Sequence, residues 1–439
     1  MSIHYYLDEL VGDLIRKPLS NSPSKSNFCI IVDGFSSGSL FIKEFLKLGL
    51  KCIHVQSNPN LKLVDKAFES KDYVENFIFN GDIEKLVNKL KYYSPLFVMP
   101  GFHTSVYLAE ELGTRLKVPS NKSMKTAYRM DKFLMHQRLS ECGLNNAKGF
   151  LIQNKDELVQ KYRSEFPSQP VILKPSNSAG TDKVFLCKNE SELINSFSQI
   201  IGGENALSLL NQNVLIQEYL EGTEYIVNTI TIDNKHITTD IWLSKKIDFK
   251  GTNFLYDKTI LLESQGFIQN ELCNYNNKVL DALEFQFGSC HNELMYTSKG
   301  PVLIEMNPRI SGGNLPVMAL ECTGMGQIGW TNILVKNILE PQAIEYCPYQ
   351  LHKNALSITL NSKKQGVVKG FKNIESLQKL PSMYQLTLRT KIGDRLNITT
   401  DVWNSPGIVH LIHKDLALLE ADYLRVREIE EEGLFLLEN

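Results

Sequence analysis

Residues 301–313 read PVLIEMNPRISGG, an apolar strand-like run that ends in a glycine-containing loop. The run begins as a buried strand would, yet Glu305, Asn307 and Arg309 then occupy every second position. Side chains two residues apart in a strand point to the same face of the sheet. The pattern therefore predicts one edge that carries a carboxylate, an amide and a guanidinium in succession.

A second strand-like segment, CHNELMY at 290–296, precedes this run, and the turn-like TSKG lies between them. A turn centred on Lys299 would place Glu293 directly opposite Glu305, since each lies six positions from residue 299. Opposed side chains of a hairpin have Cβ atoms about 4.5–5.5 Å apart, so two carboxylates there repel each other. The hairpin therefore raises the question of what compensates the repulsion.

A divalent cation would compensate it. Two carboxylates and the amide oxygen of Asn307 form an all-oxygen site of the kind that Mg²⁺ prefers, with positions left for phosphate oxygens. The alternative is that the register is misjudged by one residue and both glutamates face solvent. Hairpin geometry alone favours the metal site only slightly over this alternative.

The composition limits the class of protein. The chain has 439 residues with 43% hydrophobic content, which is enough for two to four domains. Its net charge is -2, so no electrostatic argument favours binding to nucleic acid or to an anionic membrane. The eight cysteines lack the spacing of metal ligands, and no apolar run of about 18 residues occurs. We expect a cytoplasmic protein with free thiols that binds small molecules.

The N-terminal part alternates strands and helices. Residues 28–57 predict a strand, a turn, a helix and a second strand, and residues 94–113 repeat the strand, turn and helix. This order predicts an open, mostly parallel α/β sheet over residues 1–125, with binding loops at the carboxyl ends of its strands. Asp33 and residues 36–39 lie at one such end. They are either substrate contacts or an ordinary strand-to-helix turn.

The rest of the chain predicts an α+β arrangement. Residues 123–143 have a helical pattern with Met130, Phe133 and Leu134 on one face. Strands are expected near 170–175 and 213–222, a helix near 190–200, and a hairpin over 223–243. The C-terminal part ends in a strand and an amphipathic helix. We therefore expect a central domain over 126–345, with a small subdomain at about 148–219, and a C-terminal subdomain over 346–439.

Three cations stand near these elements. Lys132 on the expected helix and Lys174 at the end of an apolar strand could neutralise a polyphosphate, with the backbone amides of residues 176–181 folded around it. Arg309 could present its planar guanidinium to a phosphoryl or acyl-phosphate oxygen. Each has an ordinary alternative, because a single lysine indicates little and an arginine in such a place is more often a surface ion-pair partner.

Five segments, in this order and spacing, resemble the ATP-grasp carboxylate-amine ligases, and among them the branch of L-amino-acid (dipeptide) ligases. They are MDKFLMHQRLSECGL (130–144), VILKPSNSAGTDKV (171–184), LIQEYLEGTEY (215–225), HNEL (291–294) and VLIEMNPRISGG (302–313). The resemblance is strong over residues 95–325 and loose outside them. It implies the ATP-grasp fold, with an N-terminal α/β domain, a small lid subdomain and a C-terminal α+β part.

The resemblance also implies the nucleotide contacts. Lys132 and Lys174 correspond to the lysines that hold the ATP phosphates, and the loop 176–181 to the one that closes over them. The adenine and ribose contacts fall on a strand and on the carboxylate that follows it. The residues implied in nucleotide binding are Lys132, Lys174, Ser178, Gly180, Thr181, Gln217, Glu218, Leu220 and Glu224.

The metal and substrate contacts follow in the same way. Glu293, Glu305 and Asn307 correspond to the ligands of Mg²⁺, of which two ions are expected, with Mn²⁺ a possible substitute. Arg309 matches the cation that stabilises the acyl phosphate. The resemblance thus implies two catalytic residues, Arg309 and Lys174. The loop beside the carboxylate substrate corresponds to Ser311, Gly312 and Gly313.

Three positions depart from the family pattern. Lys183 stands where relatives often have glycine, which would stiffen the phosphate loop. Gln217 replaces a frequent glutamate, which weakens one adenine contact. His103 takes the place of a glutamate near the substrate amine, and it either marks a different acyl donor or is an ordinary loop residue.

The implied reaction has two steps: a carboxylate attacks the γ-phosphate of ATP to give an acyl phosphate and ADP, and an amine then displaces phosphate. The expected substrates are an amino acid or small acid and an amine. A peptide ligase that tailors a natural product is the nearest alternative. An ATP-grasp kinase, which would transfer phosphate without making an amide, is a second. A homodimer is common among relatives.

Overall fold

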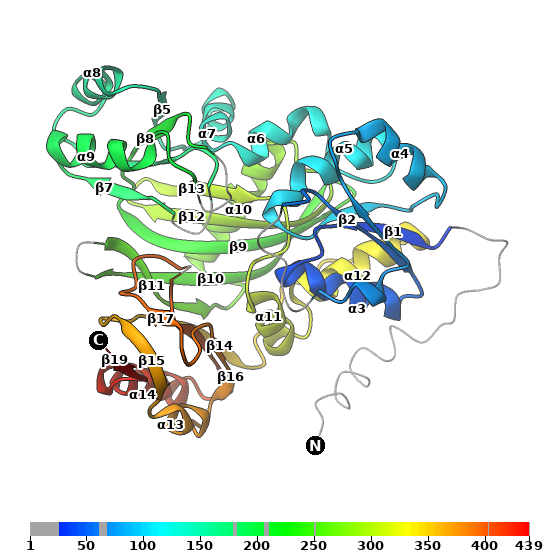
Figure 1. Ribbon diagram of the computed structural model, residues 1–439. Helices are drawn as coiled ribbons and strands as arrows, with labels where there is room; N and C mark the ends of the chain where they lie inside the picture. The colour runs from blue at the N-terminus through cyan, green and yellow to red at the C-terminus, as the bar shows by residue number, and fades with distance from the viewer. Residues whose placement is uncertain are drawn as a thin grey trace.

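The computed structural model describes residues 26–60, 68–178, 182–205, 210–249, 252–402 and 404–438. Within these residues the strands form four sheets (Figure 1). The largest has eight strands and runs through the middle of the molecule, and the other three lie around it. The mixed architecture agrees with the predicted fold class.

The N-terminal sheet is parallel, as predicted, with strand order β3-β2-β1-β4. Its strands are rich in apolar residues because helices cover the sheet. The strands are β1 (Phe28–Val32), β2 (Lys51–Gln56), β3 (Glu75–Ile78) and β4 (Val98–Pro100). The helical segments are η1 (Ser36–Gly38), α3 (Ser39–Lys47), η2 (Ser70–Asp72), α4 (Ile83–Lys91), η3 (His103–Ser105) and α5 (Val106–Leu116).

The segment 123–143 is not the single helix that we predicted. It forms η4 (Ser123–Lys125), α6 (Thr126–Met130) and α7 (Lys132–Glu141). The chain breaks at Asp131, whose extended backbone and side-chain oxygen cap α7 by accepting hydrogen bonds from the amides of Phe133 and Leu134, at 2.9 and 3.0 Å. The predicted apolar face is confirmed only at Met130, which is buried, whereas Phe133 and Leu134 are partly exposed. The buried side chains of α7 are Lys132, Met135, His136 and Leu139.

A small antiparallel sheet forms the subdomain above β12 and β13 in Figure 1, with strand order β5-β8-β6-β7. Two helices cover it and close an apolar core of their own. Its elements are β5 (Gly149–Ile152), α8 (Lys155–Glu165), β6 (Val171–Pro175), β7 (Phe185–Cys187), α9 (Glu190–Ile200) and β8 (Val214–Glu218). The strands and the helix that we expected here are confirmed.

The large sheet is antiparallel and has the order β13-β12-β9-β10-β11-β14-β18-β16. The predicted hairpin at 223–243 is present, and Asp233 and Asn234 turn it with φ of +49° and +60°. Its strands are β9 (Gly222–Ile232), β10 (Lys235–Phe249), β11 (Thr252–Leu261), β12 (Gly288–Thr297), β13 (Gly300–Asn307), β14 (Asn354–Leu360), β16 (Met383–Leu388) and β18 (Gly407–His413). Three of the helices that pack against it are α10 (Phe267–Ala282), α11 (Leu315–Thr323) and α12 (Gly326–Leu339).

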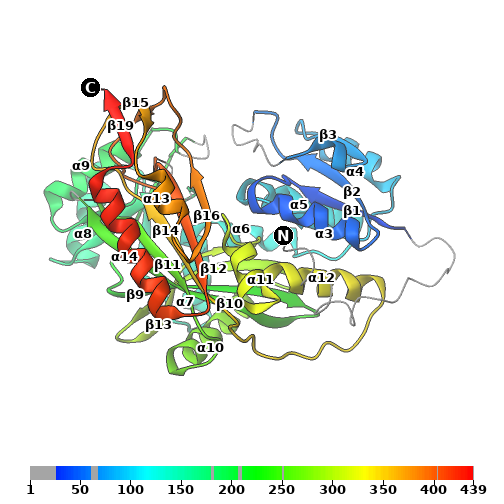
Figure 2. The ribbon, with the colours of Figure 1, turned by 90° about the horizontal axis from the view of Figure 1, so that it is seen from below.

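The C-terminal part adds β15 (Gly366–Phe371), β17 (Arg395–Leu396) and β19 (Phe435–Glu438) as a small sheet, with α13 (Ile374–Gln378) and α14 (Leu416–Glu432). Figure 2 shows α14 along the side of the molecule away from the N-terminal sheet. The large sheet contains strands from both sides of the predicted boundary at residue 345, because β14, β16 and β18 follow this residue and belong to the sheet. The division at residues 125 and 345 therefore stays a proposal.

Two further findings concern the whole described chain. All eight cysteines are free thiols, and two of them, Cys142 and Cys347, are exposed. Among the helices of the described residues, none combines the length and the apolar character that a membrane span requires.

Candidate functional site

The glutamate pair lies where the sequence placed it. Glu293 of β12 pairs directly with Glu305 of β13. A different geometry from the predicted one produces the pairing, because Thr297 pairs with Gly300 around a two-residue turn. An unbroken ladder would then put Ile304 opposite Glu293. The register shift beside Glu293 inserts one residue and restores the opposition of the two carboxylates.

Lys132 connects the small sheet with the large one. Its Nζ lies 2.7 Å from the carbonyl oxygen of Ser178, in the loop after β6, and 3.0 Å from Oε1 of Glu305. The side chain is 7% exposed, so the cation is held between a carboxylate and the predicted phosphate loop. The hydroxyl of Ser178 donates to Asp182 at 2.7 Å.

Lys174 is buried at the end of β6. Burial lowers the pKa of Lys174 to about 8, and the nearby charge of Lys132 acts in the same direction, while Glu305 and Glu293 oppose it. The structure thus brings together both predicted lysines and both glutamates. A buried cation with a lowered pKa is well suited to receive an anion.

Two side chains that sequence reasoning did not assign to the site, His291 and Lys246, lie beside this group. Burial favours the neutral form of Glu293, but the neighbouring His291 and the charge of Lys246 lower the pKa of Glu293 to about 2. His291 Nε2 lies 3.6 Å from Oε1 of Glu293. His291 has no ligand spacing in the sequence, and its place two residues from Glu293, on the same strand face, is the signal that could have identified it.

Lys246 of β10 forms a 2.6 Å ion pair with Oε2 of Glu224, the predicted ribose contact. Its Nζ also lies 4.7 Å from the centroid of the Tyr256 ring. Burial opposes the charge of Lys246, yet Glu224 and Tyr256 raise its pKa well above the ordinary value. The other oxygen of Glu224, Oε1, is buried and has no hydrogen-bond partner within the described chain.

Asn307 is the third predicted metal ligand, and His103 of η3 reaches it from the N-terminal sheet. His103 Nδ1 lies 3.1 Å from Oδ1 of Asn307, and Nη2 of Arg309 lies 3.3 Å from the same oxygen. Burial lowers the pKa of His103 to about 3, helped by the charges of Arg309 and Lys132. The imidazole is therefore neutral, and its Nδ1 donates to Asn307.

The loop after β13 has unused polar atoms. The amide of Ser311 donates to Oε1 of Gln327 at 2.8 Å, whereas its buried hydroxyl finds no partner among the described residues. Nε of Arg309 is likewise buried without a partner in the part of the chain that the structure describes. A Cβ added at Gly312 or Gly313 would meet no described atom within 4 Å. The loop therefore combines two unpartnered donors, Nε of Arg309 and the hydroxyl of Ser311, with open space beside Gly312 and Gly313.

The predicted adenine contacts lie at the end of β8. Gln217 is 4% exposed, and its Nε2 is buried without a hydrogen-bond partner in the described chain. Glu218 and Leu220 are partly buried, and Oε2 of Glu218 accepts from the amide of Lys148 at 3.3 Å. Gly180 and Thr181, which we assigned to the phosphate loop, lie outside the described residues.

Asp33, one of the residues with two interpretations, is fully buried at the end of β1. Its carboxylate accepts from the amide and the hydroxyl of Ser57, at 2.7 and 2.6 Å, and from the hydroxyl of Thr104 at 2.7 Å. These bonds tie together the loops after β1, β2 and β4. The geometry favours the turn over the substrate contact.

The donor set fits a hard divalent cation. Glu293, Glu305 and Asn307 supply carboxylate and amide oxygens on neighbouring strand positions, which is the chemistry that Mg²⁺ selects. The set contains only two acidic residues, and no group of three His, Cys, Asp or Glu side chains in the described ranges could hold a metal ion. A cation held here would draw on the amide oxygen of Asn307 as well, an oxygen that His103 and Arg309 contact in this structure.

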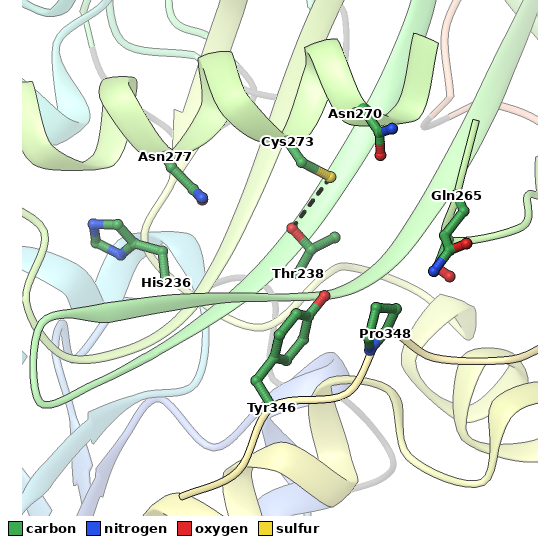
Figure 3. Close-up of a pocket in the computed structure, with 9 residues that line it drawn as sticks. His236, Thr238, Gln265, Asn270, Cys273, Asn277, Tyr346 and Pro348 are labelled. Atoms are coloured by element: carbon green, nitrogen blue, oxygen red, sulfur yellow. Dashed lines mark hydrogen bonds between the residues drawn. The ribbon is translucent and has the colours of Figure 1, made fainter. Parts of the chain in front are cut away.

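A cavity elsewhere in the molecule does not include these residues. It has a volume of about 360 Å³ and lies between α10, the start of β10 and residues 346–348. Figure 3 shows Thr238 and Cys273 in contact across it, with Tyr346 at its lower side. None of the predicted site residues lines this cavity.

Comparison with known proteins agrees with the geometry. Residues 129–313 match the family described as ATP-grasp domain. Dapdiamide A synthase of Enterobacter agglomerans is 31% identical over 412 residues, which cover 91% of this chain and 95% of that protein. The five sequence segments that carry the resemblance, with the lysines and glutamates of the site, all lie within residues 129–313.

Two solved structures share the fold. The L-amino acid ligase from Bacillus licheniformis superposes with a TM-score of 0.73 at 17% identity, over 95% of this chain and 100% of that one. The ADP complex of N5-carboxyaminoimidazole synthetase from Staphylococcus aureus gives a TM-score of 0.65 at 15% identity, over 94% and 100%. The shared fold, the family match and the 31% identical relative together define an ATP-dependent ligase.

The chain belongs to the ATP-grasp family and is a carboxylate-amine ligase that uses ATP to form an amide bond. The resemblance drawn from the sequence is thereby confirmed.

Proposed function

We propose that the enzyme activates the carboxylate of an amino acid or small acid as an acyl phosphate and couples it to an amine, with release of ADP and phosphate. The observation that carries this proposal is the convergence of two lysines and two glutamates. Lys132 donates to Glu305, Glu305 pairs with Glu293, and the charges of both glutamates act on Lys174. Four charges of both signs gathered at a sheet junction suit a nucleotide triphosphate with its cation.

Mg²⁺ would be held by Glu293, Glu305 and Asn307. When bound, it neutralises the triphosphate and the charge that develops on the transferred phosphoryl group. Lys132 and Lys174 would bind phosphate oxygens. For Lys132 this means exchanging its contact with Glu305 for one with the nucleotide, and the carbonyl of Ser178 would keep the ammonium oriented.

The remaining contacts are proposed on the same basis. The unpartnered Nε2 of Gln217 and the backbone at Glu218 and Leu220 would receive adenine. The free Oε1 of Glu224 would accept a ribose hydroxyl, while Lys246 holds its other oxygen. A buried polar atom without a partner costs about 1–3 kcal/mol, and a bound ligand would remove this cost.

The chain's own residues would then direct the chemistry. Arg309 and the hydroxyl of Ser311 would orient the carboxylate beside the γ-phosphate, with Gly312 and Gly313 leaving room for it. The guanidinium would stabilise the negative charge on the acyl phosphate when the amine attacks its carbonyl carbon. His103 lies against Asn307, so we propose that it supports the site rather than attracting a substrate ammonium group.

The test is phosphate release measured with pairs of carboxylic acids and amines. A ligase releases ADP and orthophosphate only when an acid and an amine are both present, and mass spectrometry then shows the amide. A kinase would instead leave phosphate on its product. Phosphorylated product without any amide would overturn the proposal.

We also propose that the enzyme acts on small molecules in the cytoplasm, which the eight free thiols support. A homodimer is the expected assembly, and light scattering of the purified chain would test it.

A further inference from the structure

The side chain of Gln327, near the start of α12, joins three separate segments of the chain. It has no exposed surface. Its Oε1 accepts from the backbone amide of Ser311, in the loop after β13, at 2.8 Å. Its Nε2 donates to the carbonyl oxygens of Cys290 on β12 and Thr229 on β9, at 3.0 and 3.3 Å. One side-chain amide thus holds the loop after β13 against two strands of the large sheet.

The backbone partners fix the orientation of this amide. A carbonyl oxygen can only accept a hydrogen bond, and a backbone N–H can only donate one. The NH₂ group of Gln327 must therefore face β9 and β12, and its oxygen must face Ser311. A reversed amide would place its oxygen against two carbonyl oxygens and its NH₂ group against an N–H. None of these groups titrates, so the arrangement has one orientation at any pH at which the protein is folded.

The contact also determines what Ser311 can offer to a ligand. Its backbone N–H is engaged by Gln327, whereas its hydroxyl is buried and finds no partner among the described residues. In the proposed reaction it is this hydroxyl that orients the carboxylate substrate. Cys290, the other partner of Gln327, lies three residues before Glu293 on the same strand. Gln327 therefore fixes the proposed substrate loop relative to the strand that carries a proposed metal ligand.

We propose that Gln327 is a positioning residue for the carboxylate substrate: it holds the backbone of Ser311 on the sheet and so places the hydroxyl of Ser311 beside the acid. The inference rests on the proposed function, because it takes the loop 311–313 as the carboxylate site. A misplacement of about 1 Å can lower the rate of a reaction about 100-fold. The loss should appear in the use of the acid and not in nucleotide binding, since the three bonds of Gln327 reach no proposed nucleotide contact.

Thr331, four residues further along α12, provides a matched control. It is 1% exposed, its hydroxyl donates to the backbone carbonyl of Gln327 at 2.7 Å, and it lies 3.3 Å from the hydroxyl of Ser289. Thr331→Val removes a buried hydroxyl from the same helix. It leaves the three hydrogen bonds of the Gln327 side chain in place.

The experiment measures phosphate release with a productive acid and amine, and ADP binding by isothermal titration. Gln327→Met keeps the length of the side chain and removes its amide, so we expect it to lower kcat/KM for the acid about 100-fold. Thr331→Val should change this value by less than about twofold. ADP affinity should be the same in both variants and in the wild type. If Gln327→Met does not fold, Gln327→Asn, which keeps the amide but is one methylene shorter, takes its place.

A double-mutant cycle separates positioning from a general structural role. In a Ser311→Ala background, Gln327→Met should lower kcat/KM for the acid by less than about tenfold, because the hydroxyl that it positions is absent. Full additivity in the cycle, or a loss of ADP affinity as large as the loss in the use of the acid, would overturn the inference. Phosphate release by the wild type that does not depend on any acid would overturn the proposed function, and with it the inference.

Discussion

Lys132 of α7 donates to Glu305 of β13 at 3.0 Å, although the two residues are 173 positions apart in the chain. The contact joins the helix before the small sheet to the glutamate pair of the large sheet. Without a cation at the pair, the ammonium group of Lys132 offsets part of the repulsion between Glu293 and Glu305. The same lysine is the proposed phosphate contact, so the proposal predicts that metal and nucleotide binding are coupled through it.

Replacement of Glu305 by glutamine keeps the size of the side chain and removes its charge. We expect Glu305→Gln to lower turnover at least about a hundredfold, because one oxygen ligand loses its charge. The assay is phosphate release with a productive acid and amine. Glu321→Gln is the control, since Glu321 pairs with Lys353 outside the site. Near-normal turnover of Glu305→Gln would argue against the metal site.

The lowered pKa of Lys174 predicts how ATP affinity depends on pH. Its ordinary value is 10.5, and in the folded protein it is about 8, so the ammonium form dominates below pH 8. Above pH 8 the free enzyme holds a neutral amine that must take up a proton when ATP binds. ATP affinity should therefore fall by up to about tenfold per pH unit between pH 8 and pH 10.5.

Lys174→Arg is the matched variant for this measurement. A guanidinium stays charged throughout the range, so the variant should lose the pH dependence even if its affinity is weaker at pH 7. Isothermal titration with a non-hydrolysable ATP analogue measures both proteins. An identical pH profile in the two would show that another group is responsible.

Asp33 should matter for stability and not for catalysis. Its carboxylate accepts three hydrogen bonds that join the loops after β1, β2 and β4. We expect Asp33→Ala to lower the free energy of unfolding by about 3 kcal/mol, since hydrogen bonds to charged groups contribute about 1.5–3 kcal/mol each and are not additive. Urea denaturation measures the change. A normal unfolding midpoint with a large rise in KM for the acid would instead show a substrate contact.

The sequence was sufficient for the position of the glutamate pair but not for its geometry. Alternating side chains and a short turn predicted that Glu293 and Glu305 face each other, and they do. The turn is one residue shorter than predicted, and a bulge at Ile304 compensates. Bulges depend on packing on both faces of a sheet, which alternation within one strand does not report.

Other features depend on contacts between distant segments. Lys246 becomes part of the site because β10 continues past the predicted hairpin and pairs Ser244 with Glu224, so that Lys246, two residues further along the strand, reaches the carboxylate of Glu224. The helix break at Asp131 could have been predicted, because aspartate is a preferred residue at the N-terminal cap of a helix. The apolar residues on both sides of it, however, continue the helical pattern without interruption. Local sequence patterns thus predicted where the glutamate pair lies, whereas the contact of Lys246 depends on the pairing of strands.

The Lys246–Glu224 pair gives the last prediction. Both side chains are mostly buried, at 16% and 9% exposure, and their atoms are 2.6 Å apart. Lys246→Met would leave a buried carboxylate without its cation, and breaking such a pair typically costs about 3–5 kcal/mol. We expect a lower urea midpoint, measured in the absence of nucleotide.

The double variant Lys246→Met with Glu224→Gln separates the charge from the packing. Removing the second charge should recover a large part of the lost stability, because the remaining amide costs less to bury than an ion. ATP affinity should not recover with it, since the proposed ribose contact needs the carboxylate of Glu224. A double variant that is no more stable than Lys246→Met would mean that the lysine stabilises the sheet through its contact with Tyr256 and its aliphatic chain rather than through its charge.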